Sequence, residues 1–305
     1  MYNNAKEVLE LIGDSGKSIA DIVIENEMEL SEISREAIME QLQYRYDIMY
    51  KACHDGLEKA VISISGLTGG TAKQMWDYIK TGKSIGDAST MRGVAYALSC
   101  SEVNSSMGLI VAAPTAGACG ILPGALIAAA EKMEATKEEI PLALATAAGV
   151  GQIITKNATV SGAEGGCQAE CGAAASMAAA AITQMGGGSP EQCFDAAAIA
   201  MKNVMGLVCD PVAGLVEMPC TKRNASGVTN ALLCADLALA GITSHIPFDE
   251  VVDAMYRVGK ALPSALRETA LGGIATTPTG LAMKEKIFGS GSGCSGNCAS
   301  CGACK

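Results

Sequence analysis

A series of alanine-rich, apolar segments constrains this 305-residue chain more than any other feature. Each segment is long enough for a helix, and Ala, Leu and Met favour helices, whereas strands favour β-branched and aromatic residues. Aromatic residues make up only 4% of the chain, although 49% of it is hydrophobic, enough for a sizeable core. We therefore expect an all-α fold, a helical bundle whose Gly- and Pro-rich loops form the functional site. The segments cover residues 89–101, 124–134, 141–155, 172–185, 190–205, 225–240 and 248–262.

The rest of the chain differs from these segments in composition. Residues 4–12, 19–25 and 34–60 carry apolar side chains at helical spacing, and Ser31 begins a weak capping-box pattern. A Gly-rich break follows at 66–70, and the end of the chain is a Gly–Ser linker that carries four cysteines. We expect one domain made of an N-terminal helical segment and a main helical part, followed by a flexible Cys-rich tail, with boundaries at 1–65, 66–288 and 289–305.

The charge pattern excludes several classes of partner. The net charge is −10 and no basic stripe is present, so we expect no nucleic-acid partner. The segment 108–130 is uncharged and long enough to span a bilayer. Pro114 and Pro123 interrupt it and it lacks flanking basic asymmetry, so we interpret it as buried core and expect no membrane contact. The N-terminus lacks the apolar core of a signal peptide, which indicates a cytoplasmic protein.

The cysteines point to a metal or cluster site. Thirteen cysteines without a secretory signal indicate reduced thiols rather than disulfides. The chain has only two histidines, His54 and His245, which argues against a zinc site built on several histidines. Three groups of cysteines compete for the role, and by spacing alone the tail ranks first. These groups are the tail residues Cys294, Cys298, Cys301 and Cys304, the pair Cys167 and Cys171, and the pair Cys209 and Cys220.

Several loop motifs together resemble the alpha chains, the catalytic subunits, of bacterial iron–sulfur L-serine dehydratases. The similarity extends from about Gly66 to the helices near Lys284, most of the chain. Taken together the motifs are highly specific. They are Leu67-Thr68-Gly69-Gly70, Ala112-Ala113-Pro114-Thr115-Ala116-Gly117-Ala118, Gly120-Ile121-Leu122-Pro123-Gly124, Ser161-Gly162-Ala163-Glu164-Gly165-Gly166-Cys167-Gln168, Met205-Gly206-Leu207-Val208-Cys209-Asp210-Pro211-Val212 and Pro219-Cys220-Thr221-Lys222-Arg223-Asn224.

The resemblance implies an L-serine ammonia-lyase, which converts L-serine to pyruvate and ammonia in amino-acid catabolism and gluconeogenesis. It implies a 4Fe–4S cluster on Cys167, Cys209 and Cys220, without PLP. Three thiolates leave one iron open, and an open iron acts as a Lewis acid on the serine hydroxyl. A separate beta subunit is also implied. The substrate pocket is expected at Asn104, Ser105, Ser106, Thr115, Ala116 and Gly117.

The residues themselves leave the proton acceptor open. His54 and His245 are candidates, but a lone histidine without a partner carboxylate is more often structural. The resemblance suggests that a catalytic histidine lies in the beta subunit. Lys222 and Arg223 are candidates for binding the serine carboxylate, and a solvated loop is the alternative.

Other polar and thiol groups have two interpretations each. Glu164 and Glu170 flank Cys167 and either orient ligands or serve as caps and solvated groups. Cys304 is placed to cap the open iron as a fourth ligand when substrate is absent, with Cys301 as a substitute; an oxidation-prone tail is the alternative. Structural core thiols are expected at Cys53, Cys100, Cys119, Cys171, Cys193 and Cys234.

Two other functions stay open at this point. A related cluster-dependent lyase, such as an L-cysteine desulfidase, would use the same open iron. A non-catalytic metal-binding protein would need only the cysteines. Pyruvate release from serine, threonine and cysteine distinguishes the lyases, and the effect of cysteine substitutions on a bound chromophore distinguishes the binding protein.

Overall fold

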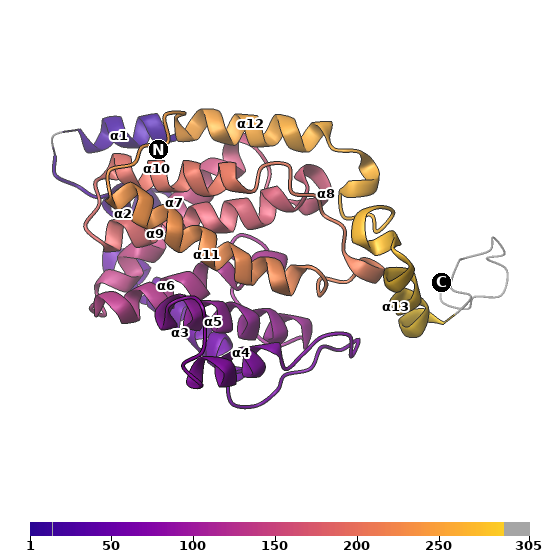
Figure 1. The fold of residues 1–305 in the computed structure, drawn as a ribbon. Helices are drawn as coiled ribbons and strands as arrows, with labels where there is room; N and C mark the ends of the chain where they lie inside the picture. The colour runs from indigo at the N-terminus through magenta and orange to yellow at the C-terminus, as the bar shows by residue number, and fades with distance from the viewer. Residues whose placement is uncertain (14, 290–305) are drawn as a thin grey trace.

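The computed structural model describes residues 1–13 and 15–289 and consists of helices joined by loops (Figure 1). Within these residues there are helices and isolated β-bridges but no strand, so the all-α prediction is confirmed. The α-helices are α1 (Ala5–Ile12), α2 (Ile19–Ser31), α3 (Arg35–Asp55), α4 (Thr71–Lys80), α5 (Ala88–Ser105), α6 (Ile121–Met133), α7 (Glu139–Asn157), α8 (Gly162–Gly165), α9 (Ala173–Met185), α10 (Pro190–Asn203), α11 (Cys220–Leu239), α12 (Phe248–Ala261) and α13 (Pro278–Phe288).

Helix α9 is the centre of the fold. Every residue from Ala173 to Thr183 is buried. The helix packs against α6, α7, α10 and α11, which surround it (Figure 1). The distance between packed helices depends on the side chains at the contact, so alanines allow all four neighbours to approach closely. The alanine-rich composition therefore reflects a helix enclosed by other helices.

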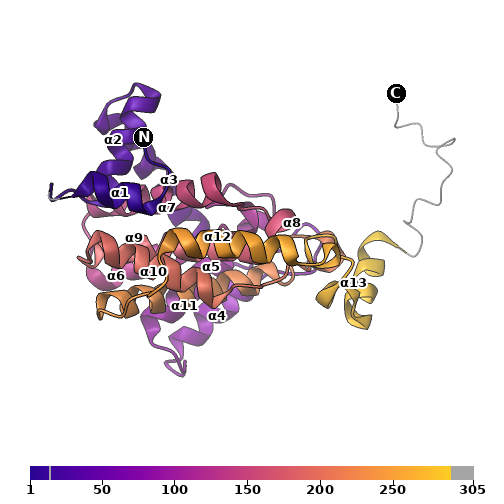
Figure 2. The ribbon, with the colours of Figure 1, turned by 90° about the horizontal axis from the view of Figure 1, so that it is seen from above.

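Two groups of helices flank this centre, and a third group gathers at one end. α12 and α1 lie along one side near α10, whereas α3, α4 and α5 lie on the other side (Figures 1 and 2). The third group consists of α8, the start of α11 and α13, which lie toward the same end of the molecule (Figure 2). The functional site described below is built at this end.

The contact between α5 and α6 requires glycine. A Cβ added at Gly124 would lie 2.8 Å from the carbonyl oxygen of Gly93, and one added at Gly120 would lie 2.5 Å from the carbonyl oxygen of Ala97. These distances are shorter than van der Waals contact with backbone atoms, so any larger residue would push the two helices apart. The close approach holds the start of α6 against the middle of α5.

Helix boundaries differ from the expected ones at identifiable residues. The capping box expected at Ser31 is wrong, because Ser31 ends α2 and the box is formed at its start by Ser18 and Asp21. The helix expected to reach residue 60 ends at Asp55, because the amide of Gly56 donates to the Ser99 hydroxyl at 2.8 Å instead of continuing the helix.

Further helices match the expected ones only in part. α4 was not expected, whereas α13 lies where helices near Lys284 were expected. α11 begins at Cys220 rather than at residue 225. This earlier start places the motif from Cys220 to Asn224 in the first turns of a helix. The side chains of that motif therefore have fixed directions, which a free loop would not provide.

One stretch of the described residues, Ala116–Met133, is long and apolar enough to cross a membrane, but 72% of it is buried inside the fold. Residues 118–130 are buried without exception. The interpretation of residues 108–130 as core is therefore confirmed for 118–130 only, because residues 108–117 are exposed or half-buried apart from Ala113. The division into residues 1–65 and 66–288 stays a prediction, although α2 and α3 pack against α7 and α5. The tail from residue 290 on, with Cys294, Cys298, Cys301 and Cys304, lies outside the described residues.

Candidate active site

Three separate segments bring cysteines together at one end of the molecule. Cys167 lies at the start of a π-helical turn, Gln168–Gly172, that leads into α9. Cys209 lies in the loop between α10 and α11, and Cys220 is the first residue of α11. Cys167 and Cys209 are 2% and 3% exposed, so neither is a surface thiol. The three residues expected as cluster ligands are thus held in one buried region, together with Cys171, whose Sγ lies 3.3 Å from that of Cys167.

The side chain of Gln168 holds this region together. It is fully buried, and its Nε2 donates to the carbonyl oxygens of Gly165 at 2.8 Å and Met255 at 3.0 Å. Its Oε1 accepts from the amide of Gly206 at 2.8 Å. Its own amide donates to the carbonyl of Leu207 at 3.0 Å. Because Gln168 is fully buried and these polar groups of its side chain and backbone are paired, it connects the Cys167 turn to α12 and to the loop of Cys209.

The backbone of Cys209 is fixed from the other side. Its amide donates to the carbonyl of Leu266 at 2.9 Å, and its carbonyl accepts from the amide of Glu268 at 2.8 Å. These bonds form an isolated parallel β-bridge between Cys209 and Arg267. The segment that follows α12 therefore sets the direction of the Cys209 side chain.

A buried ion pair lies next to the thiols. Arg223, on the first turn of α11, donates to Asp210 Oδ1 at 2.8 Å and to the carbonyl of Val208 at 2.9 Å. The side chains of Arg223 and Asp210 are only 17% and 4% exposed. Asp210 Oδ2 also accepts from the amide of Ile274 at 2.9 Å. This pair places a fixed positive charge beside Cys167.

The Glu170 carboxylate faces the same thiols. Its Oε1 accepts from the Thr115 hydroxyl at 2.8 Å, and its Oε2 lies 3.9 Å from Cys209 Sγ. Burial raises the pKa of this carboxyl to about 7, with a further contribution from Cys167; the hydrogen bond from Thr115 opposes the rise. Of the two acidic residues that flank Cys167, Glu170 points into the site, whereas Glu164 is exposed.

Hydrogen bonds and burial shift the pKa values of the thiols in this site in different directions. Bonds from Cys171 and Cys209, together with the Arg223 guanidinium, hold the pKa of Cys167 well below its usual range despite burial. The hydrogen bond between Cys171 and Cys167 raises the pKa of Cys171 well above the usual range of a cysteine. Burial raises the pKa of Cys220 to about 12. The thiolate is the ligand form of cysteine, and Cys167 is the position at which this site stabilises it best.

The loops expected to bind substrate lie against this region. Asn104 Nδ2 donates to the carbonyl of Ala116 at 3.2 Å, and Asn224 Nδ2 donates to the carbonyl of Gly117 at 2.7 Å. Asn224 Oδ1 also accepts from the amide of Gly120 at 2.8 Å. Thr115 and Gly117 both lie next to Glu170. The end of α5, the turn at residues 116–118 and the start of α11 are therefore connected beside the cysteines.

Two other expected pocket residues bond within their own helix. The hydroxyls of Ser105 and Ser106 donate to the carbonyls of Glu102 and Val103 at the end of α5. Both side chains remain partly exposed. Their contact with substrate stays a prediction.

Glu217 is a site residue that the sequence reasoning missed. It is 5% exposed, and its Oε2 accepts from the hydroxyls of Ser65 at 2.8 Å and Thr68 at 3.0 Å. Its carbonyl accepts from both the amide and the hydroxyl of Thr221. Glu217 thus connects the Gly-rich loop at 66–70 to the turn that precedes Cys220. The only available signal was its place as one of two acidic residues, with Asp210, in the ten-residue loop between two cysteines.

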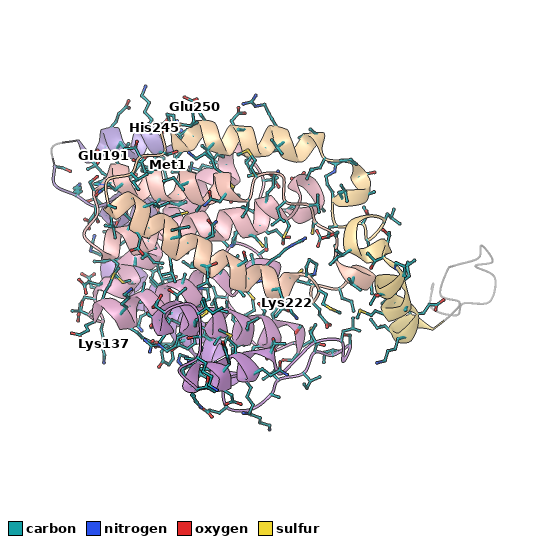
Figure 3. The ribbon with its side chains drawn as sticks, viewed as in Figure 1. Met1, Lys137, Glu191, Lys222, His245 and Glu250 are labelled. Carbon is teal, nitrogen blue, oxygen red and sulfur yellow. The ribbon has the colours of Figure 1, made fainter. Side chains whose placement is uncertain are left out.

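The candidate bases lie apart from this network. His54 Nδ1 faces the carbonyl of Tyr50 at 2.7 Å, and its ring stacks on Tyr50 and lies 4.8 Å from Tyr96. His245 lies away from Lys222 (Figure 3) and is exposed, with its Nδ1 3.3 Å from the Thr243 hydroxyl. His54 therefore has the contacts of a structural residue, and no contact joins His245 to the thiols among the described residues.

The two candidate cations have different surroundings. Lys222 is exposed at the start of α11, where it remains a candidate for binding the serine carboxylate. Arg223 is bonded internally to Asp210 and Val208, so binding of a carboxylate by its guanidinium stays a prediction that competes with these bonds.

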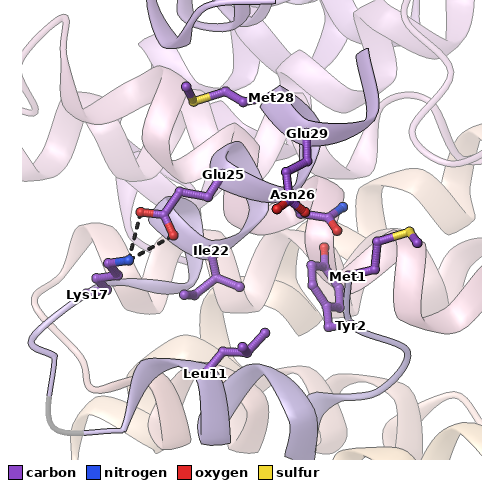
Figure 4. A pocket seen from close by; sticks show the side chains of 9 residues that line it. All are labelled: Met1, Tyr2, Leu11, Lys17, Ile22, Glu25, Asn26, Met28 and Glu29. Atoms are coloured by element: carbon purple, nitrogen blue, oxygen red, sulfur yellow. Dashed lines mark hydrogen bonds and ion pairs between the residues drawn. The ribbon is translucent and has the colours of Figure 1, made fainter. Parts of the chain in front are cut away.

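Two cavities bear on the location of the site. One of about 400 Å³ lies behind the thiols and is lined by Cys171, Gly206, Arg223 and Ser226, among others. A larger one, of about 570 Å³, lies between α1 and α2 (Figure 4). Its lining contains the Lys17–Glu25 ion pair but no cysteine. The larger cavity is therefore not the site that the cysteines define.

The donor set determines what the site can hold. Among the described residues, no three His, Cys, Asp or Glu side chains are arranged to hold a single metal ion. The site nevertheless combines thiols from three separate segments, of which Cys167 and Cys209 are buried and Cys220 is half-buried, with a half-buried arginine and carboxylate. Thiolates are the usual ligands of iron–sulfur clusters, and in a 4Fe–4S cluster each cysteine binds a different iron, so three cysteines need not surround one metal ion. The arrangement is that of a helical protein with a thiol-rich, polar site enclosed at one end.

Comparison with known proteins agrees with this class. The chain belongs to the family described as serine dehydratase alpha chain, whose model matches residues 14–275. It is 50% identical over 289 residues to the probable L-serine dehydratase, alpha chain, of Bacillus subtilis, covering 95% of this chain and 96% of that protein. It is 48% identical over 291 residues to the L-serine dehydratase, alpha chain, of Peptoniphilus asaccharolyticus, covering 95% of this chain and all of that protein.

A longer relative shows a different organisation. L-serine dehydratase 1 of Escherichia coli is 34% identical over 284 residues, which cover 90% of this chain but only 61% of that protein. The longer relative therefore contains a substantial part to which this chain does not align.

Proposed function

We propose that this chain catalyses the conversion of L-serine to pyruvate and ammonia, with an iron–sulfur cluster on Cys167, Cys209 and Cys220. The observation that carries the proposal is the convergence of these three thiols, from separate segments, beside Glu170 and Arg223. The similarity to proteins named L-serine dehydratase, alpha chain, over 95% of the chain supports the substrate. The reaction removes water across Cα and Cβ of serine, and hydrolysis of the resulting enamine releases ammonia.

The residues fit a cluster that has one open iron. Cys167, Cys209 and Cys220 would each hold one iron, and Arg223 would balance part of the negative charge of the thiolates. When bound, such a group supplies a Lewis acid for the serine hydroxyl, which is otherwise a poor leaving group. This chemistry needs no PLP.

The surrounding residues position the substrate and exclude water. Asn104 and Asn224 hold the turn at residues 116–118 by its carbonyl oxygens, so that the turn keeps its place next to Glu170. We assign Asn104, Thr115 and Gly117 to the wall that binds serine. Glu170, held by Thr115, faces the thiols and would orient the hydroxyl and the water that it forms. Correct placement of reacting groups contributes a large part of enzymatic rate enhancement.

A second chain belongs to this proposal. The longer relative contains a part that this chain does not match, and the other two relatives are named alpha chains. We propose that a separate beta subunit completes the active site and that the enzyme acts in the cytoplasm. We also propose that Cys304 caps the open iron when substrate is absent. This residue lies outside the described residues.

The proposal is tested by anaerobic purification with the beta subunit, followed by iron and sulfide analysis and assays of pyruvate release. Wild-type protein is expected to contain iron and to release pyruvate from serine in preference to threonine and cysteine. Cys220→Ser is expected to lose both iron and activity, whereas Cys234→Ser, a buried thiol on the same helix, keeps them. Pyruvate release by iron-free protein, or a preference for cysteine, would contradict the proposal.

A further inference from the structure

A fourth thiol in the site has no role in the proposed reaction. Cys171 is 3% exposed, and its Sγ lies 3.3 Å from that of Cys167. This separation is shorter than the 3.8 Å between the sulfurs of Cys100 and Cys119, a close pair in the apolar core. A disulfide needs an S–S distance of about 2.05 Å, so the two sulfurs of the first pair have little distance left to close.

The local backbone permits this closure at some cost in strain. Side chains four residues apart on a helix have Cβ atoms about 5–6 Å apart, whereas a disulfide prefers about 3.8 Å. The segment between Cys167 and Cys171 is a π-helical turn, with Gly166 before it and Gly172 at its end. Glycines give the backbone freedom to adjust. A disulfide formed here would be strained, and strained disulfides are the readily reduced ones.

The surroundings favour oxidation of this pair over the other. The pair lies next to the polar Arg223–Asp210 ion pair, and its sulfurs are only 3.3 Å apart. The cavity of about 400 Å³ is lined by Cys171 and Arg223, so a small molecule can approach the pair from the side of Cys171. Cys100 and Cys119 are instead embedded in an apolar cluster with Val103 and Ile127.

We propose that Cys167 and Cys171 are a redox modification site, at which a small peroxide converts the metal-free pair into a reversible disulfide. The Cys167 thiolate attacks one oxygen of hydrogen peroxide, the O–O bond breaks, and hydroxide leaves as water after protonation. The Cys171 sulfur then attacks the Cys167 sulfur, the S–S bond forms, the S–O bond breaks, and the Cys171 proton leaves with the second water. Two thiols lose two electrons and one peroxide is reduced to two waters.

This disulfide would protect the site after loss of its metal. It removes Cys167 from the ligand set, so loading stops until a thiol reductant restores the pair. It also prevents oxidation of Cys167 to the sulfinic and sulfonic acids, which thiol reductants do not reverse. The inference rests on the proposed function at one point only, the assignment of Cys167 as a ligand of the iron–sulfur cluster.

The test uses the full chain, stripped of metal by a chelator without oxygen and then treated with hydrogen peroxide. Free thiols are alkylated, the protein is denatured, and it is cut after glutamate. Cleavage at Glu164, Glu170 and Glu191 separates Cys167 from Cys171, so their disulfide joins two peptides, residues 165–170 and 171–191, in the mass spectrum. We expect this cross-link, its disappearance after dithiothreitol, and alkylated Cys100 and Cys119.

Variants and metal loading provide the controls. Cys171→Ala, with helix content checked by circular dichroism, should lose the cross-link and accumulate Cys167 sulfinic or sulfonic acid, whereas Cys100→Ala should behave like wild type. Cys171→Ser gives the same information if the alanine variant fails to fold. Iron loading of oxidised wild type should fall about tenfold and recover after reduction.

Two results would overturn the inference: recovery of both cysteines in alkylated form, or a disulfide of Cys167 with Cys209 or Cys220 that is equally abundant in Cys171→Ala. The cross-link is measured without substrate. If the cross-link forms while the loaded enzyme releases no pyruvate, the proposed function fails and the redox site stands. If the loaded enzyme releases pyruvate but the cross-link does not form, the redox site fails and the proposed function stands.

Discussion

Two groups of cysteines in the interior of this chain differ in the charge and polarity of the residues around them. One contains Cys167, Cys171, Cys209 and Cys220, and its neighbours are Arg223, Asp210 and Glu170. The other contains Cys53, Cys100 and Cys119, which pack among Ala, Val, Ile and Tyr side chains between α3, α5 and α6. A count of buried thiols would treat the two groups alike.

The comparison teaches that charged neighbours, rather than burial, mark a reactive thiol group. In the apolar group, a hydrogen bond from Cys100 and burial raise the pKa of Cys119 well above its usual range. In the polar group, hydrogen bonds and a nearby guanidinium lower the pKa of Cys167. A buried charge is costly unless it is paired, so Asp210 allows the Arg223 guanidinium to stay largely buried beside Cys167.

The largest expected effect separates the two groups by metal content. Cys209→Ser should reduce bound iron and pyruvate release by about 100-fold or more, because serine is a harder and less acidic donor than a thiolate. Cys100→Ser, its matched change in the apolar group, should leave iron per chain unchanged. Iron analysis of anaerobically purified protein makes the measurement. Equal losses in both variants would remove the distinction between the groups.

The next effect concerns the buried ion pair. Asp210→Ala leaves the Arg223 guanidinium buried and unpaired, so we expect it to lower the free energy of unfolding of the metal-free protein by about 3 kcal/mol. Asp55→Ala removes an exposed partner of Lys51 and should cost about 0.5 kcal/mol or less. Urea unfolding followed by circular dichroism compares them. A small loss for Asp210→Ala would mean that the pair is not required to build the site.

A smaller effect is expected in the apolar group. Cys100→Ala leaves a small cavity in a well-packed cluster and should lower the free energy of unfolding by about 1–2 kcal/mol. Iron content and pyruvate release should match wild type. The same urea experiment, paired with iron analysis, checks both expectations; loss of iron in this variant would show that the apolar group also supports the site.

The smallest effect is a dependence on pH. The pKa of Cys119 is raised in the folded state, so its neutral form is favoured there, while the unfolded thiol ionises near pH 8.5. Its contribution to stability is therefore complete below about pH 8.5 and is lost as the pH rises further. Between wild type and Cys119→Ala, the difference in unfolding free energy should shrink by about 1 kcal/mol from pH 8 to about 9.5. A difference independent of pH would contradict the assignment.

Much of the fold could be predicted from local sequence. Alanine-rich segments with few aromatic residues specify helices through backbone propensity, and most of the expected helices are present. Boundaries were harder: α3 ends where the amide of Gly56 meets the hydroxyl of Ser99, on a different helix. A contact between residues so distant in sequence leaves no local pattern.

The site shows the same division. The sequence by itself determined that the protein is helical and rich in reduced thiols, and its loop motifs singled out Cys167, Cys209 and Cys220, although spacing alone ranked the tail first. Only the tertiary structure decided which groups surround them: Asp210 for Arg223, Ser65 and Thr68 for Glu217, and Cys171 for Cys167. Helix propensity is a property of neighbouring residues along the chain, whereas the charge and hydrogen bonding around a thiol depend on segments that only packing brings together.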